Sequence, residues 1–151
     1  MKTMPDHDRH PRERGAILAF TGIVLMTLVG MTVVGVDIGR LAFTATEVQT
    51  VAEVAATGYA RSWLNGLAAG DDPSDATCAA EALQVVDGNS IDGQAAAPGN
   101  IEGYERGFFD FDTHGPFSAS VPGGETANAV RATATTTVSN FFGALFGYHR
   151  H

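Results

Sequence analysis

The chain has a single cysteine, Cys78, among its 151 residues. One thiol cannot form an intrachain disulfide, and it cannot build a thiolate metal cluster. Two roles are open for it: an apolar residue on a helix, or a crosslink between subunits. Apolar residues are not scarce, because 44% of the chain is hydrophobic and only 17% is charged. This balance is typical of a folded protein rather than a disordered one.

Basic side chains are scarce after the N-terminal region. From Asp37 onward, five basic residues stand against fourteen acidic ones, whereas four basic and three acidic residues precede Gly15. An acidic body repels phosphate backbones, and the sequence has no basic patch with interleaved aromatic residues. We therefore expect no nucleic-acid partner.

Catalytic motifs are also missing from the sequence. It contains no Gly-x-Ser-x-Gly, no glycine-rich phosphate loop and no His-Glu-x-x-His. Asp110, Asp112 and His114 alternate in "DFDTH", and such groups on one face of a strand can bind a divalent metal. The Gly115-Pro116 that follows favours a turn instead, since turns commonly contain Asp and Thr. We predict no enzyme, no metal site and no cofactor.

The sequence does contain one long uncharged run, from Ala16 to Val36. Its twenty-one residues would form a helix of roughly 32 Å, at about 1.5 Å per residue, which is enough to cross a bilayer core. An export signal has a shorter apolar region, of about 7–15 residues, followed by a small-x-small cleavage site. No A-x-A pattern closely follows this run. The sequence therefore predicts a transmembrane helix over residues 16–36.

The charges that flank this run predict its direction in the membrane. Arg9, Arg12 and Arg14 precede it, and only Arg40 lies near its other end. Basic residues flank membrane helices mainly on the cytoplasmic side. We expect residues 1–15 to form a basic cytoplasmic tail and the acidic body to lie outside the cytoplasm.

Glycines in this segment would let a second helix come close. Gly35 and Gly39 form a small-xxx-small pair at the outer end of the predicted membrane helix, a spacing that permits close contact between helices in lipid. The candidate positions for packing of membrane helices are Gly22, Gly30, Gly35 and Gly39.

The helix is expected to continue beyond the membrane, because no helix breaker follows the apolar run. We predict one helix from about residue 16 to about residue 67, with residues 37–70 as its extracytoplasmic continuation. Apolar residues recur there at alternating spacings of four and three, which is typical of one face of an amphipathic helix. This face either packs on the chain's own domain or continues a contact between subunits. Its residues, here called the seam, are Leu41, Ala45, Val48, Ala52, Ala55 and Tyr59.

Residues 71–151 are expected to form a small α+β domain. Ser74 or Asp75 is the expected N-cap of a short helix that ends near residue 86. The apolar spacing predicts that this helix buries Ala79, Leu83 and Val86.

Beyond this short helix the sequence changes character. Residues 87–99 are rich in turn residues and predict loops. Segments 104–111, 117–121 and 129–138 are rich in aromatic, valine and threonine residues and predict a small antiparallel sheet. The last residues, 139–151, predict a short apolar helix, which either caps the core or touches the membrane surface.

The motifs together point to a family. "RERGAILAF…VGVDIGRLAFTATEVQTVAEVAATGYA" resembles the N-terminal region of the TadE/TadG-like proteins of the tight-adherence (Flp) pilus system. In that family an Arg-Gly flank, here Arg14-Gly15, leads into an apolar helix. A Val-Asp-x-Gly-Arg segment, here residues 36–40, then precedes a Thr-Glu-x-Gln stretch, here residues 46–49. "GFFDFDTHGPFSASVPGGETANAVRATATTTVSNFFGALFG" is similar to the strands and the closing Phe-Phe helix of that family.

The resemblance implies a bacterial inner-membrane protein with a periplasmic or extracellular body. Such a protein assists pilus assembly or joins the fibre as a minor subunit, and its partners are pilus-system proteins or further copies of itself, contacted through the N-terminal helix. The alternative from a different class is a membrane-anchored binding or adhesion module that is not built into a fibre.

The chain departs from the family pattern at the processing site. Pilins of this system carry a glutamate five residues after the glycine at which they are cleaved. With Gly15 as that glycine, the position holds Phe20, so cleavage between Gly15 and Ala16 is disfavoured. The chain is therefore nearer the TadG-like branch, but it is too short to contain that branch's long extracytoplasmic insertion.

Overall fold

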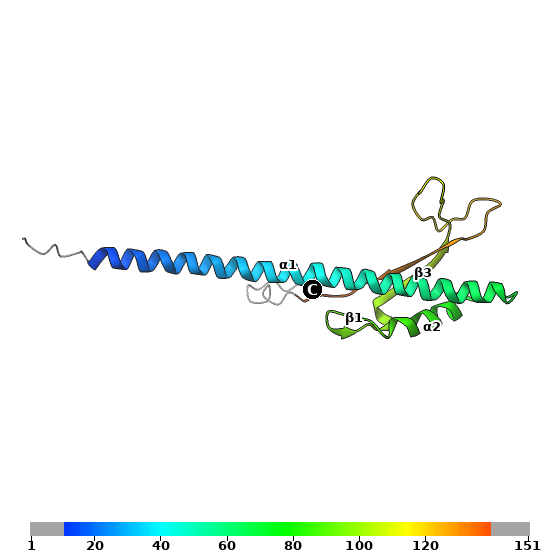
Figure 1. Ribbon diagram of the computed structural model, residues 1–151, viewed down its shortest axis with the longest axis horizontal. Coiled ribbons are helices and arrows are strands. Elements are labelled where there is room, and N and C mark those ends of the chain that lie inside the picture. Colours follow the sequence, from blue (N-terminus) through cyan, green and yellow to red (C-terminus); the bar gives the residue numbers. More distant parts are fainter. Residues whose placement is uncertain (1–10, 140–151) are drawn as a thin grey trace, which may run out of the picture. The chain divides into compact units, whose positions relative to one another are not determined.

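The computed structural model describes residues 11–139, and residues 11–14 by their backbone alone. By its internal contacts the chain divides into two units. The N-terminal unit contains residues 11–40 of the described chain, and the body contains Leu41–Ser139. The elements in chain order (Figure 1) are α1 (Pro11–Ala68), α2 (Asp75–Val86), β1 (Ser90–Ile91), β2 (Gln94–Ala95), the 3-10 turn η1 (Pro98–Asn100), β3 (Ile101–Gly107) and β4 (Ala129–Ala134).

This architecture confirms the α+β class, with a long N-terminal helix, a short second helix and small antiparallel sheets. The expected C-terminal helix lies outside the described residues. Helix α1 ends at Ala68, close to the predicted end, because Gly70 adopts a left-handed conformation with φ +84°. The amides of Gly70 and Asp71 donate to the carbonyls of Leu67 and Gly66, which closes the last turn of the helix.

Helix α2 begins after Ser74, which resolves the choice between the two candidate N-caps. The Ser74 hydroxyl accepts a hydrogen bond from the Thr77 amide at 3.2 Å. The helix buries Cys78, Ala82 and Val86, so the prediction for Val86 is confirmed.

The prediction that α2 buries Ala79 and Leu83 was wrong, since both are only half-buried. The close approach of α1 explains the difference. A Cβ on Gly58 would lie 2.6 Å from Val85 Cγ2 and 3.1 Å from Ala82 Cα, so α1 can pack against the Ala82 face only because residue 58 has no side chain.

Strands β3 and β4 pair antiparallel, with Tyr104 opposite Ala132 and Gly107 opposite Ala129. Both strands are shorter at their far ends than predicted, and β3 begins three residues earlier, at Ile101. The alternation predicted for β4 is observed, because Val130, Ala132 and Ala134 are half-buried while Arg131 and Thr133 are exposed.

The predicted third strand over residues 117–121 does not form. Only Ser118 pairs, in a single bridge in which it exchanges both backbone hydrogen bonds with Phe108, at 2.8 and 2.9 Å. Beyond Phe108 the Asp110 side chain binds the amides of Asp112 and Thr113, and this turns the chain away from the ladder.

The predicted loop over residues 87–99 contains regular structure instead. Strands β1 and β2 form a two-residue hairpin, in which Ser90 pairs with Ala95. Asp92 and Gly93 both have positive φ, as the tight turn between right-twisted strands requires.

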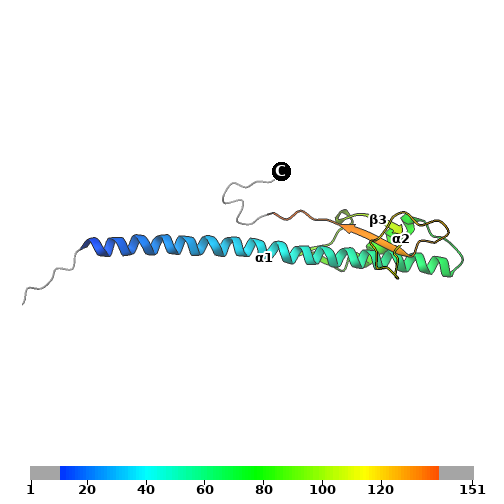
Figure 2. The ribbon, with the colours of Figure 1, turned by 90° about the horizontal axis from the view of Figure 1, so that it is seen from above.

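The core of the body lies between α1 and the elements that follow it. One cluster contains Val51, Ala55, Val86, Ile91 and Ala96, and a second contains Tyr59, Trp63, Cys78 and Ala82. Since Val86 packs with Val51 while Cys78 packs with Trp63, α2 runs antiparallel to α1. Figures 1 and 2 show α2 and β3 beside the last part of α1.

Gly107 is expected to be essential to the stability of the body. A Cβ at this position would overlap the Ser118 carbonyl oxygen and the ring of Phe117. Gly107→Ala should therefore lower the free energy of unfolding by about 1–3 kcal/mol, as overpacking of a filled site does. Urea denaturation followed by the fluorescence of Trp63, the single tryptophan, measures this.

Gly103→Ala is the matched control for this variant. It lies in the same strand, and a Cβ there would meet nothing within 4 Å. Equal effects of the two variants would contradict the packing explanation.

Candidate membrane and helix-packing surfaces

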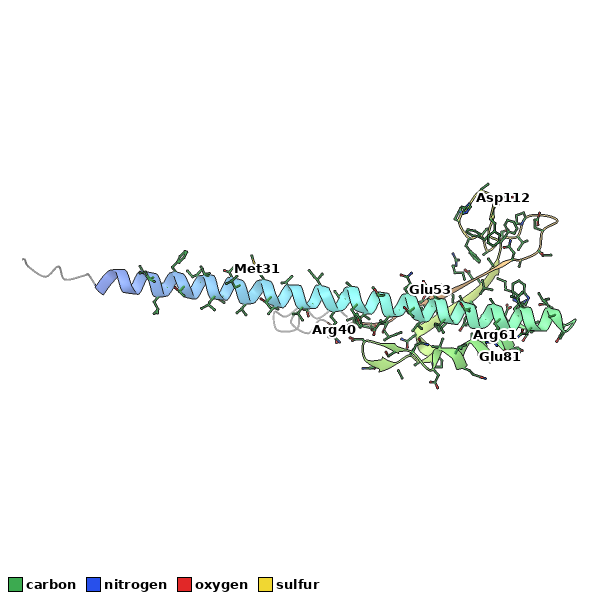
Figure 3. The ribbon with its side chains drawn as sticks, viewed as in Figure 1. Met31, Arg40, Glu53, Arg61, Glu81 and Asp112 are labelled. Carbon is green, nitrogen blue, oxygen red and sulfur yellow. The ribbon has the colours of Figure 1, made fainter. Side chains whose placement is uncertain are left out.

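The apolar side chains of residues 16–36 are exposed on every side of α1. Leu18 is 78% exposed and Met26 80%, and Figure 3 shows such side chains projecting from the helix, Met31 among them. Burial of one large apolar side chain is worth about 1.5–3 kcal/mol, so such exposure in water is costly. Among the described residues, α1 is the one helix long and apolar enough to cross a membrane.

The hydroxyl groups in this segment are already satisfied. Thr21, Thr27 and Thr32 each donate to the carbonyl oxygen four residues earlier, at 2.9 Å. A hydrocarbon environment offers no hydrogen-bond partners, so polar groups there must find partners within the protein. These threonines therefore bring no unpaired hydroxyl into a bilayer, and the segment fits a single-pass membrane protein.

The glycines proposed for helix packing have open space around them. A Cβ added at Gly22, Gly30, Gly35 or Gly39 would meet no heavy atom within 4 Å, and the same holds for Gly15. Ala16, on the other side of the candidate processing bond, is exposed. The structure leaves room for a neighbouring helix at these positions.

The seam divides between the interior of the body and its surface. Ala55 and Tyr59 are buried, and Val48 and Ala52 are half-buried, with Val48 packed against the first core cluster. This part of the seam packs on the chain's own domain. Leu41 and Ala45 are exposed, so a contact with another subunit stays a prediction for these two residues.

The buried face of α1 also includes residues outside the seam, namely Thr44, Val51, Ser62 and Trp63. A strict alternation of four and three has a period of 3.5 residues, whereas an α-helix has 3.6. The two drift apart by about 20° in every seven residues. The buried face of the helix therefore departs from the predicted seam along its length. For this reason the predicted spacing did not include Val51 and Trp63.

Arg106 of β3 is the most connected side chain of the body. Its guanidinium donates to Asp72 Oδ1 at 2.9 Å, to the Pro73 carbonyl at 2.5 Å and to the Tyr59 hydroxyl at 3.0 Å. It also forms an ion pair with Asp75 at 3.0 Å. One residue of β3 thus holds the end of α1, the loop after it and the start of α2.

The rings of α1 enclose the same cation. The guanidinium carbon lies 4.8 Å from the centre of the Trp63 ring and 5.7 Å from that of Tyr59. The Trp63 indole donates to Asp72 at 3.2 Å, and the Tyr59 ring stacks on Tyr104 at 5.0 Å. We call Tyr59, Trp63, Asp72, Asp75 and Arg106 the arginine clamp.

The clamp changes the acidity of its members. Burial, and then the hydrogen bond to Asp75, raises the pKa of Tyr59 to about 12, although Arg106 opposes this shift. Burial alone would lower the pKa of Arg106, but its contacts with Tyr59, Asp72 and Asp75 raise it overall. The phenol is therefore neutral and the guanidinium charged over the whole physiological range.

Stability should fall at high pH because of Tyr59. Its pKa is higher in the folded chain than its unfolded value of about 10, so folding favours the protonated phenol. Its contribution is full below about pH 10 and is lost as the pH rises towards 12. Unfolding free energies from urea denaturation at pH 8 and pH 11 should show this loss.

Tyr59→Phe should reduce this loss without abolishing it. The pKa of Tyr104, which burial also raises, acts in the same direction and is still present in the variant. A variant that loses as much stability between pH 8 and pH 11 as the native chain would contradict the assignment to Tyr59.

Cys78 is fully buried in the second core cluster, 3.8 Å from Arg106 Nη2. A crosslink between subunits would need the body to open, so in the folded chain Cys78 serves as a small apolar residue. This position matches the first of the two roles open from the sequence.

The segment "DFDTH" forms a turn. Asp110 accepts hydrogen bonds from the Asp112 and Thr113 amides and from the Thr113 hydroxyl, and these bonds lower its pKa. His114 has a left-handed backbone, with φ +51°. Within residues 11–139 there is no group of three or more His, Cys, Asp or Glu side chains that could hold a metal ion.

Two surface depressions flank α1 in the body. The α1–α2 groove, of about 780 Å³, is lined by residues that include Val54, Gly58, Arg61, Glu81, Gln84 and Val85. The aromatic hollow, of about 430 Å³, is lined by residues that include Ala52, Ala56, Phe109, Phe111, Phe117 and Val130. Both are surfaces on which another molecule can pack.

Comparison of the chain with protein-family models, with curated proteins and with solved structures finds no match.

Proposed function

We propose that this chain is an inner-membrane protein of a tight-adherence (Flp-type) pilus system. In this role it assists pilus assembly or enters the fibre as a minor pilin-like subunit, and it acts by association of N-terminal helices. The observation that carries the proposal is helix α1. Its apolar part, residues 16–36, is exposed on all sides, and the same helix continues as the main support of a folded body.

The proposed mechanism is packing between membrane helices. Gly22, Gly30, Gly35 and Gly39 have open space around them, which supports close approach of a second helix in lipid. The basic N-terminus would stay in the cytoplasm, and the acidic body would lie in the periplasm or outside the cell. The family motifs at Arg14-Gly15 and at residues 36–40 and 46–49 support the choice of the pilus system.

A charge inside the apolar segment should release the chain from the membrane. Leu25 and Leu28 are both more than half exposed, and an arginine at the centre of a membrane helix costs about 2.5–3.5 kcal/mol. The double variant Leu25→Arg, Leu28→Arg should therefore move from the alkali-resistant membrane fraction to the soluble or aggregated fraction.

Leu64→Arg is the control for this variant, because Leu64 is as exposed but belongs to the body. It should stay in the membrane fraction. Retention of the double arginine variant in membranes would overturn the anchor.

Association through the membrane helix is tested by crosslinking. Single cysteines at Gly30 or Gly35 should form adducts in membranes, either with a second copy or with a pilus subunit identified by mass spectrometry. The native chain is the background control, since its Cys78 is buried. N-terminal sequencing of the same material tests processing, and a mature chain that starts at Ala16 would show that Phe20 does not prevent cleavage.

The second candidate, a membrane-anchored binding module, is favoured by the aromatic hollow. Phe111 is 67% exposed beside it, and Phe109 packs edge-on against Phe111 at 5.1 Å. Exposed aromatic residues around an apolar depression are typical of surfaces that bind a partner. The crosslinks separate the two candidates, because a module that acts through this hollow needs no contact at Gly30 or Gly35.

A further inference from the structure

The α1–α2 groove is the exposed face of an antiparallel helix pair. Cys78 of α2 packs at the level of Trp63 in α1, and Val86 packs at the level of Val51. Ala82 and Val85 contact α1 at Gly58, so Glu81 lies close to the level of Arg61. Both residues line the groove, and Figure 3 labels Arg61 on α1 and Glu81 on α2.

The charges in this groove are of both signs. They are those of Arg61, Glu81 and Glu53, and the Glu53 carboxylate accepts a hydrogen bond from Gln49 one turn earlier in α1. Arg106 and Arg131 form ion pairs, with Asp72 and Glu105 among their partners, whereas Arg61 forms none with any described residue. Glu81 also has no ion pair within residues 11–139. The body is strongly acidic, and a face lined by carboxylates alone would repel a second copy of the chain.

We propose that a second copy of this chain docks on the α1–α2 groove. The two helix pairs then form a short four-helix bundle, in which Arg61 of each copy faces Glu81 of the other. This inference rests on the proposed function, because anchorage in one membrane makes the two copies of α1 parallel. It adds a contact in the body to the contact between membrane helices.

Parallel copies related by a twofold axis along α1 keep equal residues at equal heights. Since Arg61 and Glu81 lie near one height in each copy, the symmetry brings each arginine to the other copy's glutamate. Such an interface is self-complementary, as the commonest protein dimers are. A basic helix from another protein would satisfy Glu53 and Glu81 but would leave Arg61 facing a like charge.

The shape of the groove suits helix packing. Val85 is 49% exposed, and Val54 is half-buried. The small residues Gly58 and Ser62 also line the groove. Two antiparallel helix pairs can pack face to face as a four-helix bundle. Here the facing side is mixed, because Val54 and Val85 lie among polar residues such as Thr50, Asn65 and Gln84. The exposed ion pairs would select the partner and the register rather than supply most of the affinity.

Charge reversal in two differently tagged full-length chains tests the proposal in membranes. Gln84→Cys, in the groove, reports contact through a short bismaleimide crosslinker. Arg61→Glu alone and Glu81→Arg alone should each lower self-crosslinking by about fivefold or more, because each places like charges opposite one another. Co-expression of the two variants should restore crosslinking, and only between the different tags, because the mixed dimer regains both ion pairs.

Glu125→Arg is the matched control, an exposed charge reversal outside the groove that should leave crosslinking unchanged. Urea denaturation followed by Trp63 fluorescence should show the same midpoint for all variants. Mixed dimers no more abundant than self-dimers, or crosslinks from Gln84→Cys only to a different protein, would overturn the proposal. The proposed function is tested separately: absence of crosslinked adducts from cysteines at Gly30 and Gly35 would contradict it, whatever the result in the groove.

Discussion

The body of this protein is organised around one cation, the guanidinium of Arg106. A half-buried arginine is costly unless its donors are satisfied and its charge is balanced, and here carboxylates, a carbonyl, a hydroxyl and two aromatic faces do both. Its partners come from α1, from the loop after it and from α2. Arg106 thus joins the end of α1 to the start of α2.

The N-terminal unit is constrained by its apolar surface rather than by a charge in its interior. Its segment over residues 16–36 has no interior, and the whole surface of the helix there is apolar, with its hydroxyl groups bonded back to the backbone. Such a helix is stable only where its surroundings are apolar too. In the proposed function the two units have different roles. Residues 11–40 require lipid or neighbouring helices around them, and the body presents the α1–α2 groove and the aromatic hollow to partners.

Local signals predicted the elements whose limits depend on local chemistry. Ser74, one of the two expected N-caps, caps α2 through its own hydroxyl, and Gly70 ends α1 because it accepts a left-handed backbone. The third strand failed because Asp110 offers the backbone a competing set of hydrogen bonds. The buried face of α2 differs from the predicted one, because Gly58, which is distant in sequence, decides which face of α2 can approach α1.

The sequence by itself determined that residues 16–36 form an apolar helix long enough for a bilayer, with its basic flank on one side and an acidic body on the other. Those properties are sums over neighbouring residues, so no tertiary contact is needed to evaluate them. Only the tertiary structure decided that Arg106 joins Tyr59, Trp63, Asp72 and Asp75, and that Arg61 and Glu81 share a groove. The hydrogen-bonded residues of the arginine clamp are 9 to 47 positions apart in the sequence. No periodicity in the sequence specifies which of such distant side chains will meet.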